Sequence, residues 1–118
     1  MSINPEHVDN ILSGKKLYEF RKIRCKRDID SIVIYSTAPV MKVVAEVKVT
    51  ALIEGTPSYV WGRTHDAAGI KKDFFDSYYS NKQKAVAYCL GKVKQFAKPR
   101  SLEHYGIKNA PQSFIYLD

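Results

Sequence analysis

Hydrophobic and polar residues alternate most regularly over residues 43–53. Apolar residues occupy every second position of this segment: Val43, Ala45, Val47, Val49, Ala51 and Ile53. Because successive side chains of a strand point to opposite faces, this pattern predicts a strand with one apolar and one mixed face. Residues 31–36 are apolar and β-branched, which is typical of a strand buried on both faces. Further strands are predicted at residues 1–3, 16–23, 84–94 and 113–116.

Two segments between these strands carry helix-starting signals. Asn4-Pro5 is a capping residue followed by a proline at the first helical position, and Gly14 is a natural stop. The apolar residues between them recur at helical spacing: Val8, Ile11 and Leu12. A helix is therefore predicted over residues 5–13. Thr56-Pro57 repeats the same start and predicts a helix near residues 57–65.

An aromatic stripe predicts one more helix, near residues 71–80. Its members recur at helical spacing: Phe74, Phe75, Tyr78 and Tyr79. We expect the stripe to pack against the sheet rather than to stack nucleobases. Trp61 is expected to anchor the core, and the alternative is that it belongs to a protein-binding surface. Residues 98–100 predict a turn, and residues 101–104 predict one helical turn.

Strands predominate in this pattern, with short helices inserted between them. The predicted class is therefore α+β. Consecutive strands joined by short turns would close into a small β-barrel, with the helices covering one side of the barrel. The chain has 118 residues, the usual size of one domain, so residues 1–118 are expected to form a single unit.

The formal net charge of +7 adds a candidate partner to this fold. An excess of Lys and Arg favours RNA, DNA, a nucleotide or an acidic surface, although a soluble basic protein without such a partner has the same composition. The charge is densest over residues 14–27, where seven basic residues surround one acid, Glu19. Apolar and aromatic residues alternate with these charges, which favours an ordered strand over a solvated tail.

The centre of this run is a candidate binding site. Glu19 and Arg21 point to the same face of the predicted strand, but Lys16 has the opposite parity. Lys16 joins them only if the chain twists or bulges just after Gly14. The site would then hold a lysine for phosphate, a guanidinium for bidentate contacts and a carboxylate for a base edge. Structural ion pairs use the same residue types, so the cluster alone does not establish catalysis.

Further basic residues could extend this surface. Lys15 and Lys22 flank the cluster. A second stretch without any acid contains Lys92 and Lys94, and Lys98 has matching strand parity. Such a stretch either follows a nucleic-acid backbone or keeps the protein soluble, and the sequence favours neither interpretation.

The sequence carries no motif for a metal or a cofactor. Cys25 and Cys89 do not form a Cys-x-x-Cys pair. His7, His65 and His104 lack metal-ligand spacing and are interpreted as surface or supporting groups. A Gly-rich phosphate loop and a signal peptide are also missing from the sequence. We therefore expect a monomeric cytoplasmic protein that binds RNA or a nucleotide, uses no metal and no cofactor, and does not bind a membrane.

The basic cluster also resembles the signature of the ASCH family, Gly-x-Lys-x-x-Glu-x-Arg after a short helix. Here the segment reads Gly14-Lys15-Lys16-Leu17-Tyr18-Glu19-Phe20-Arg21, a full match. Three further segments resemble small stand-alone members of the same family: Ile-Leu-Ser-Gly at 11–14, Ile-Tyr-Ser-Thr-Ala-Pro at 34–39, and Ala-Pro-Gln-Ser-Phe-Ile-Tyr-Leu at 110–117. These segments follow one another in the family's order, so the resemblance covers nearly the whole chain.

The resemblance implies a PUA-like β-barrel with a cleft between the barrel and its helices. Lys16, Glu19 and Arg21 would line this cleft, and Thr37 and Gln112 would border it. The resemblance also implies a role for the domain in RNA metabolism, translation, RNA modification or transcriptional coactivation, through binding of RNA or a nucleotide in the basic cleft.

Some members of the superfamily are enzymes, which leaves a second hypothesis open. One branch hydrolyses N4-acetylcytidine with the signature lysine, a threonine at the position of Glu19, and a later glutamate. This chain departs from that branch, because it has Ala67-Ala68-Gly69 where the second acid is expected, with His65 and Asp66 as nearby candidates. Ribonuclease activity is also ascribed to some relatives. If the domain is an enzyme, Lys16 and Glu19 are the predicted catalytic residues.

Overall fold

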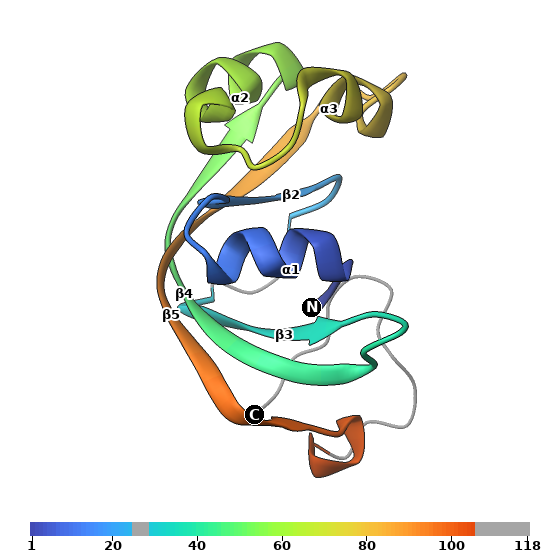
Figure 1. Ribbon diagram of the computed structural model, residues 1–118. Helices are drawn as coiled ribbons and strands as arrows, with labels where there is room; N and C mark the ends of the chain where they lie inside the picture. Colours follow the sequence, from blue (N-terminus) through green and yellow to red (C-terminus); the bar gives the residue numbers. More distant parts are fainter. Residues whose placement is uncertain (25–28, 106–118) are drawn as a thin grey trace.

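The computed structural model describes residues 1–24 and 29–105, and the structural statements below concern these residues (Figure 1). They form a mixed sheet of five strands with three short α-helices. The strands are β1 (Ser2–Ile3), β2 (Tyr18–Arg21), β3 (Ser31–Ser36), β4 (Lys42–Gly55) and β5 (Ala85–Arg100). The helices are α1 (Pro5–Leu12), α2 (Pro57–Thr64) and α3 (Lys72–Tyr78), with 3₁₀ turns at His65–Ala67 and Leu102–Tyr105.

Two long antiparallel strands, β4 and β5, form the spine of the sheet. They pair from Gly55 and Ala85 at one end to Val43 and Arg100 at the other. The strand order is β1-β3-β4-β5-β2, in which only β1 and β3 run parallel. In Figure 1 the β4–β5 pair curves along one side of the molecule, with α2 and α3 at one end and α1 on the inner side of the curve. The sheet therefore has a concave side on which α1 lies.

The α+β class is confirmed, but a closed barrel is not shown. The edges of the described sheet are β1 and β2, and neither forms a ladder with the other. One side chain spans them, because the Arg21 guanidinium on β2 donates to the Ser2 carbonyl on β1 at 2.8 Å. None of the described helices is long and apolar enough to cross a membrane.

The interior consists of two hydrophobic clusters on opposite faces of β5. Ala85 and Ala87 belong to one cluster, while Val86 and Tyr88 belong to the other. This alternation follows from the two-residue repeat of a strand. The larger cluster lies between α1, β3 and β4, and the smaller one lies between β2, α2 and α3. Lys16 lies in the short segment that joins α1 to β2.

Most predicted elements are present, with one clear error at the end of β5. The predicted turn at residues 98–100 is wrong, because β5 continues to Arg100. The register between β4 and β5 jumps there, so that Gln95 pairs with Ala45 but Arg100 pairs with Val43. A strand accommodates a proline in such an irregular stretch, where no ladder hydrogen bond is required. The strand predicted at 113–116 lies outside the described residues.

The aromatic stripe packs as predicted in all but one member. Phe75 is 1% exposed and contacts Phe20 and Trp61, with ring centroids 5.2 and 4.8 Å apart. Tyr79 is also buried. Trp61 therefore anchors the core, as expected. Phe74 differs from its neighbours because its side chain is 50% exposed.

The contrast between these neighbours gives a stability prediction. Phe75→Ala should lower the free energy of unfolding by about 3–5 kcal/mol, because it empties a fully buried site. Phe74→Ala is the matched control and should cost less than about 1 kcal/mol, because half of this side chain already faces water. Urea denaturation measures both values, and equal losses would contradict the assignment of the two rings.

Candidate functional site

Lys16 reaches the site because the chain turns sharply between α1 and β2. Gly14 adopts a left-handed conformation, with φ of 81°, which most side chains disfavour. The Lys16 N–H then donates to the Asn10 carbonyl at 3.0 Å. Lys16 lies before the start of β2, so the alternation of strand side chains does not apply to it. The Lys16 side chain therefore reaches the same face as Glu19 and Arg21. The predicted site required this bend of the chain after Gly14.

Two cations hold the Glu19 carboxylate from either side. Lys16 Nζ lies 4.0 Å from Oε1, and Arg21 Nη2 lies 3.2 Å from Oε2. Each cation has a second acceptor on the backbone: Lys16 Nζ donates to the Ala68 carbonyl at 2.9 Å, and Arg21 Nη2 to that of Ser2. Lys16 is 2% exposed and Glu19 is 7% exposed. The formal charges sum to +1, so the interior carries an excess positive charge.

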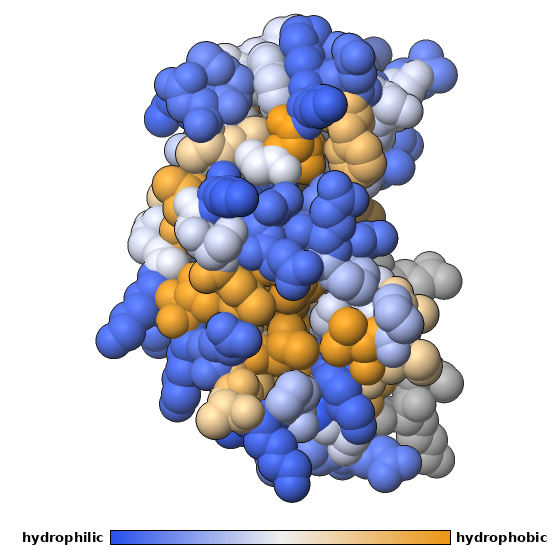
Figure 2. Space-filling model, in the orientation of Figure 1, coloured by the Kyte–Doolittle hydropathy of each residue, from blue (hydrophilic) through white to orange (hydrophobic). Residues whose placement is uncertain are grey.

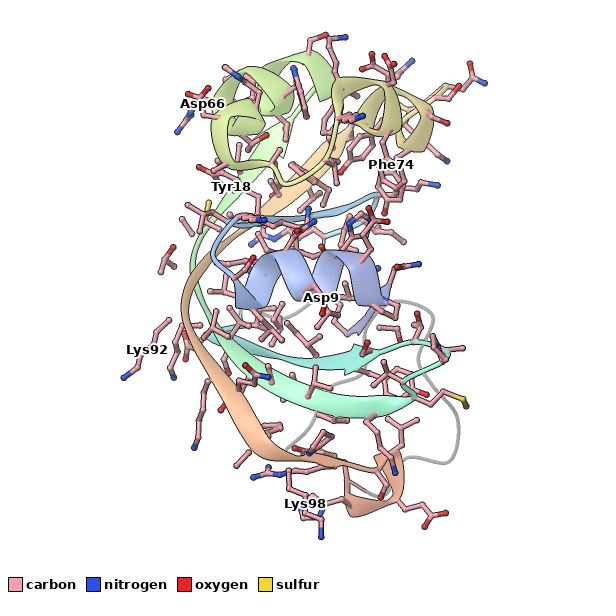
Figure 3. The ribbon with its side chains drawn as sticks, viewed as in Figure 1. Asp9, Tyr18, Asp66, Phe74, Lys92 and Lys98 are labelled. Atoms are coloured by element: carbon pink, nitrogen blue, oxygen red, sulfur yellow. The ribbon has the colours of Figure 1, made fainter. Side chains whose placement is uncertain are left out.

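This cluster lines a cavity of about 160 Å³. The walls come from segments that are distant in the sequence: Ser2, Ile3, Asn4, His7, Lys16, Glu19, Phe20, Arg21, Ile70, Phe74 and Tyr78. Figure 3 shows side chains from α1, β2 and α3 converging beside the labelled Phe74. Hydrophilic side chains cover the surface over α1 in the space-filling view (Figure 2). A ligand in the cavity would therefore meet buried positive charge on one side and aromatic rings on another.

Two buried nitrogen atoms of the cavity wall have no hydrogen-bond partner among the described residues. They are Arg21 Nε and His7 Nδ1. An arginine Nε always carries a proton, so Arg21 offers a donor without an acceptor. Leaving such a buried group unpaired costs about 1–3 kcal/mol. An oxygen atom of a ligand would remove that cost.

Burial changes the ionisation of two cavity residues. The pKa of Lys16 is lowered from 10.5 to about 8, chiefly by desolvation. The Glu19 carboxylate opposes this shift, and the Arg21 charge adds to it. Desolvation, together with the nearby Lys16 charge, also lowers the pKa of His7 below its usual 6.5, while Glu19 and Glu6 oppose this. At neutral pH, Lys16 is still mostly protonated and His7 is mostly neutral. The cavity therefore combines a proton donor and a proton acceptor.

Two other predicted binding residues, Lys22 and Thr37, contact residues that line the cavity. Lys22 Nζ lies 4.7 Å from the ring centre of Tyr78, which lines the cavity. The Thr37 N–H donates to the carbonyl of Ile3, which also lines it. Lys15 is exposed and does not line the cavity.

The second basic stretch lies elsewhere. Lys92 and Lys94 are exposed on β5, and in Figure 3 Lys92 lies on the outer side of the curved β4–β5 pair, whereas α1 lies on the inner side. His65 and Asp66 form an exposed pair at 3.1 Å that does not line the cavity, so they do not supply a second acid there. Gln112 lies outside the described residues. Within residues 1–24 and 29–105, no group of three or more His, Cys, Asp and Glu side chains could hold a metal ion.

Sequence reasoning missed three features of the site. His7 was interpreted as a surface or supporting group, and Phe74 as part of the core, yet both line the cavity. Neither residue carries a spacing signal that could have revealed this position. In the sequence, Gly69 stands out only as part of the segment that lacks a second acid, but φ is 72° there, and an added Cβ would lie 2.9 Å from the Lys16 Cα atom. A glycine is therefore required where the backbone passes Lys16.

Gly69→Ala should displace Lys16. The left-handed conformation and the clash together predict a loss of about 2–4 kcal/mol in the free energy of unfolding. Gly62→Ala is the matched control, since a Cβ at Gly62 in α2 meets nothing within 4 Å. It should leave stability unchanged or raise it by about 0.5–1 kcal/mol. Thermal denaturation compares the two, and a tolerated Gly69→Ala would contradict the close approach.

The lowered pKa of Lys16 predicts how stability depends on pH. Between about pH 8 and pH 10.5 the unfolded chain keeps the Lys16 proton and the folded protein loses it, so the free energy of unfolding rises with pH in this window. Relative to Lys16→Met, the wild type should gain about 3 kcal/mol across it. Urea denaturation at both ends of the window measures the gain. Lys15→Met, an exposed neighbour, is the control, and parallel pH curves for the wild type and Lys16→Met would contradict the prediction.

Comparison with known proteins identifies relatives of the whole chain. No family model matches it. An ASCH domain-containing ribonuclease from Zymomonas mobilis is 32% identical over 122 residues, which cover 99% of this chain and 82% of that protein. The crystal structure of ASCH from Zymomonas mobilis superposes with a TM-score of 0.90 at 28% identity, over 100% of this chain and 85% of that one. A mutant of that protein gives a TM-score of 0.91.

Two proteins of Ureaplasma parvum also contain similar segments. ATP synthase subunit alpha is 24% identical over 99% of this chain, and large ribosomal subunit protein uL22 is 31% identical over 73% of it. The chain spans only 15% and 28% of the lengths of these two proteins. The Zymomonas ribonuclease, in contrast, matches over most of its length, with the same fold. The chain therefore belongs to the ASCH domain family and has that family's PUA-like α+β fold.

Proposed function

We propose that this domain binds RNA in the cavity between α1, β2 and α3 and cleaves the RNA backbone. The observation that carries the proposal is the buried cluster in which Lys16 and Arg21 share one carboxylate and leave a net charge of +1. The full-length similarity to a protein named a ribonuclease supports it. A phosphodiester is an anion that would compensate the excess charge and offer an oxygen to Arg21 Nε.

The arrangement suits the charge that develops during cleavage. Negative charge grows on the phosphate oxygens in the transition state, and preorganised cations that already face the cavity stabilise it without reorganising. Arg21 supplies a planar fork of donors, and Lys16 supplies a point charge. Glu19 holds both cations in place, so in this proposal it is a positioning residue rather than a nucleophile.

The neighbouring 2′-hydroxyl of RNA supplies the nucleophile. His7 accepts the proton of this hydroxyl, the 2′ oxygen bonds to phosphorus, and the bond from phosphorus to the 5′ oxygen breaks. The Lys16 ammonium gives its proton to the leaving 5′ oxygen. The products are an RNA end with a 2′,3′-cyclic phosphate and a second RNA with a 5′-hydroxyl. DNA lacks the 2′-hydroxyl and would not be cleaved by this route.

The sequence leaves two other functions open. An RNA-binding module without catalysis would use the same cavity and the same cations, and the experiment below separates it from a ribonuclease. Hydrolysis of N4-acetylcytidine has less support, because Glu19 is occupied by two cations and the exposed His65–Asp66 pair lies outside the cavity.

The test is cleavage of end-labelled single-stranded RNA at low salt by the purified domain. The wild type should produce fragments with 2′,3′-cyclic phosphate ends. Arg21→Ala, Lys16→Met and His7→Gln should each lower the rate by about 100-fold or more, because each removes a charge or a proton-transfer group. Activity of the wild type should fall as acidification protonates His7, and this acid limb should be missing from any residual activity of His7→Gln.

The control is the double variant Lys92→Met/Lys94→Met, which removes two exposed charges outside the cavity. At saturating RNA it should cleave at a rate close to that of the wild type, because these charges act on the capture of RNA and not on the cleavage step. Cleavage that survives equally in all cavity variants would show that it does not arise at this site. Salt-sensitive RNA binding without cleavage would leave a binding module and refute the ribonuclease.

A further inference from the structure

Phe74 is a large apolar side chain that the fold leaves uncovered beside the proposed phosphate site. Its ring is 50% exposed, whereas Phe75, the next residue of α3, is fully buried. Phe74 lines the cavity of the cation cluster, and in Figure 3 it projects from α3 on the side that faces α1. A single exposed apolar side chain is common on a protein surface, but this ring lies in the wall of the cavity and is therefore accessible to a ligand there.

A second hollow adjoins the cavity across Phe74. It has a volume of about 630 Å³, within the range of small-molecule sites. Its walls are Glu6, His7, Gly69, Ile70, Lys71, Asp73 and Phe74. Three of these residues, His7, Ile70 and Phe74, also line the cavity of the cation cluster. One ligand can therefore occupy both spaces, with Phe74 between them.

The two spaces differ in charge. Lys16, Arg21 and Glu19 give the first cavity a formal charge of +1. In the second hollow, Glu6 and Asp73 outnumber Lys71, so the formal charge there is −1 when His7 is neutral. A phosphate is attracted to the first space and repelled from the second, whereas an uncharged base is not repelled from either. This polarity orients a nucleotide with its phosphate on Arg21 and its base beside Phe74.

We propose, on the basis of the proposed function, that Phe74 is a stacking platform for one unpaired nucleobase, so that the domain selects single-stranded over double-stranded RNA. His7 packs edge to face against Phe74, with ring centroids 5.4 Å apart at 67°, and holds the ring in its orientation. The faces of bases in a duplex are covered by their neighbours, so only an unstacked base reaches an aromatic platform of this kind.

The experiment measures binding of a fluorescent RNA to the intact domain by anisotropy, with a single-stranded oligonucleotide and the duplex of the same sequence. Phe74→Ala should weaken binding of the single strand by about 5- to 150-fold, the usual effect of losing one base–aromatic stack. Phe74→Trp should retain the affinity, and Phe74→Leu should not, because leucine fills space without stacking. Tyr59→Ala is the matched control, since Tyr59 is 49% exposed on α2 and lines neither space.

The outcomes separate this inference from the proposed function. If Arg21→Ala abolishes binding while Phe74→Ala binds like the wild type, the platform is wrong and the phosphate site stands. If Phe74→Leu binds as tightly as Phe74→Trp, the ring serves as an apolar surface, such as a protein contact, and stacking is refuted. If the wild type binds no RNA, both proposals fail. A circular dichroism spectrum of Phe74→Ala that matches the wild type shows that a loss of binding does not come from unfolding.

Discussion

Lys16 carries an ammonium group into the protein interior, where removing its charge from water costs several kcal/mol. The surrounding contacts offset only part of this cost: the Glu19 carboxylate at 4.0 Å, the Ala68 carbonyl at 2.9 Å and the face of the Phe20 ring at 4.7 Å. The pKa of about 8 shows that the charged form remains disfavoured relative to water. Two glycines with positive φ, Gly14 and Gly69, shape the backbone around this one side chain. The buried Lys16 charge lowers the stability of the fold, so the binding of a ligand accounts for its presence better than a contribution to folding does.

Arg21 connects this local cluster to the architecture of the sheet. Its guanidinium bridges Glu19 and the Ser2 carbonyl, and thereby joins the two edge strands, β2 and β1. The cavity lies where these edges approach each other without forming a ladder, and between the two hydrophobic clusters. A closed ladder would fill that gap with backbone hydrogen bonds. Among the described strands, the cavity therefore occupies the open stretch between β1 and β2, beside the buried charges.

Local signals in the sequence were sufficient to predict most helices and strands and the central residues of the candidate site. The caps Asn4 and Thr56 mark the starts of α1 and α2, and both cap side chains accept backbone N–H groups as expected. The ASCH signature located Lys16, Glu19 and Arg21. The other residues of the candidate site depend on tertiary packing, which the sequence does not show. Phe74 and Phe75 are adjacent and chemically identical. Only the packing of α3 against Phe20 and Trp61 makes Phe75 the buried ring and Phe74 the exposed one. His7 likewise became part of the site only through the neighbours that surround it.

The net charge of +7 and the cavity charge of +1 have different physical roles. Lys92 and Lys94 are exposed, so salt screens their attraction for a polyanion within about 8 Å under physiological conditions. Such charges raise the encounter rate and the sequence-independent affinity, but they do not fix where a phosphate lies. Lys16 and Arg21 are shielded from water, so their field is weakly screened and acts over a short range with defined geometry. In the proposed function, gathering RNA on a basic surface and positioning one phosphate beside buried charge are therefore separable properties. Only the second requires the close approach of the Gly69 backbone to Lys16.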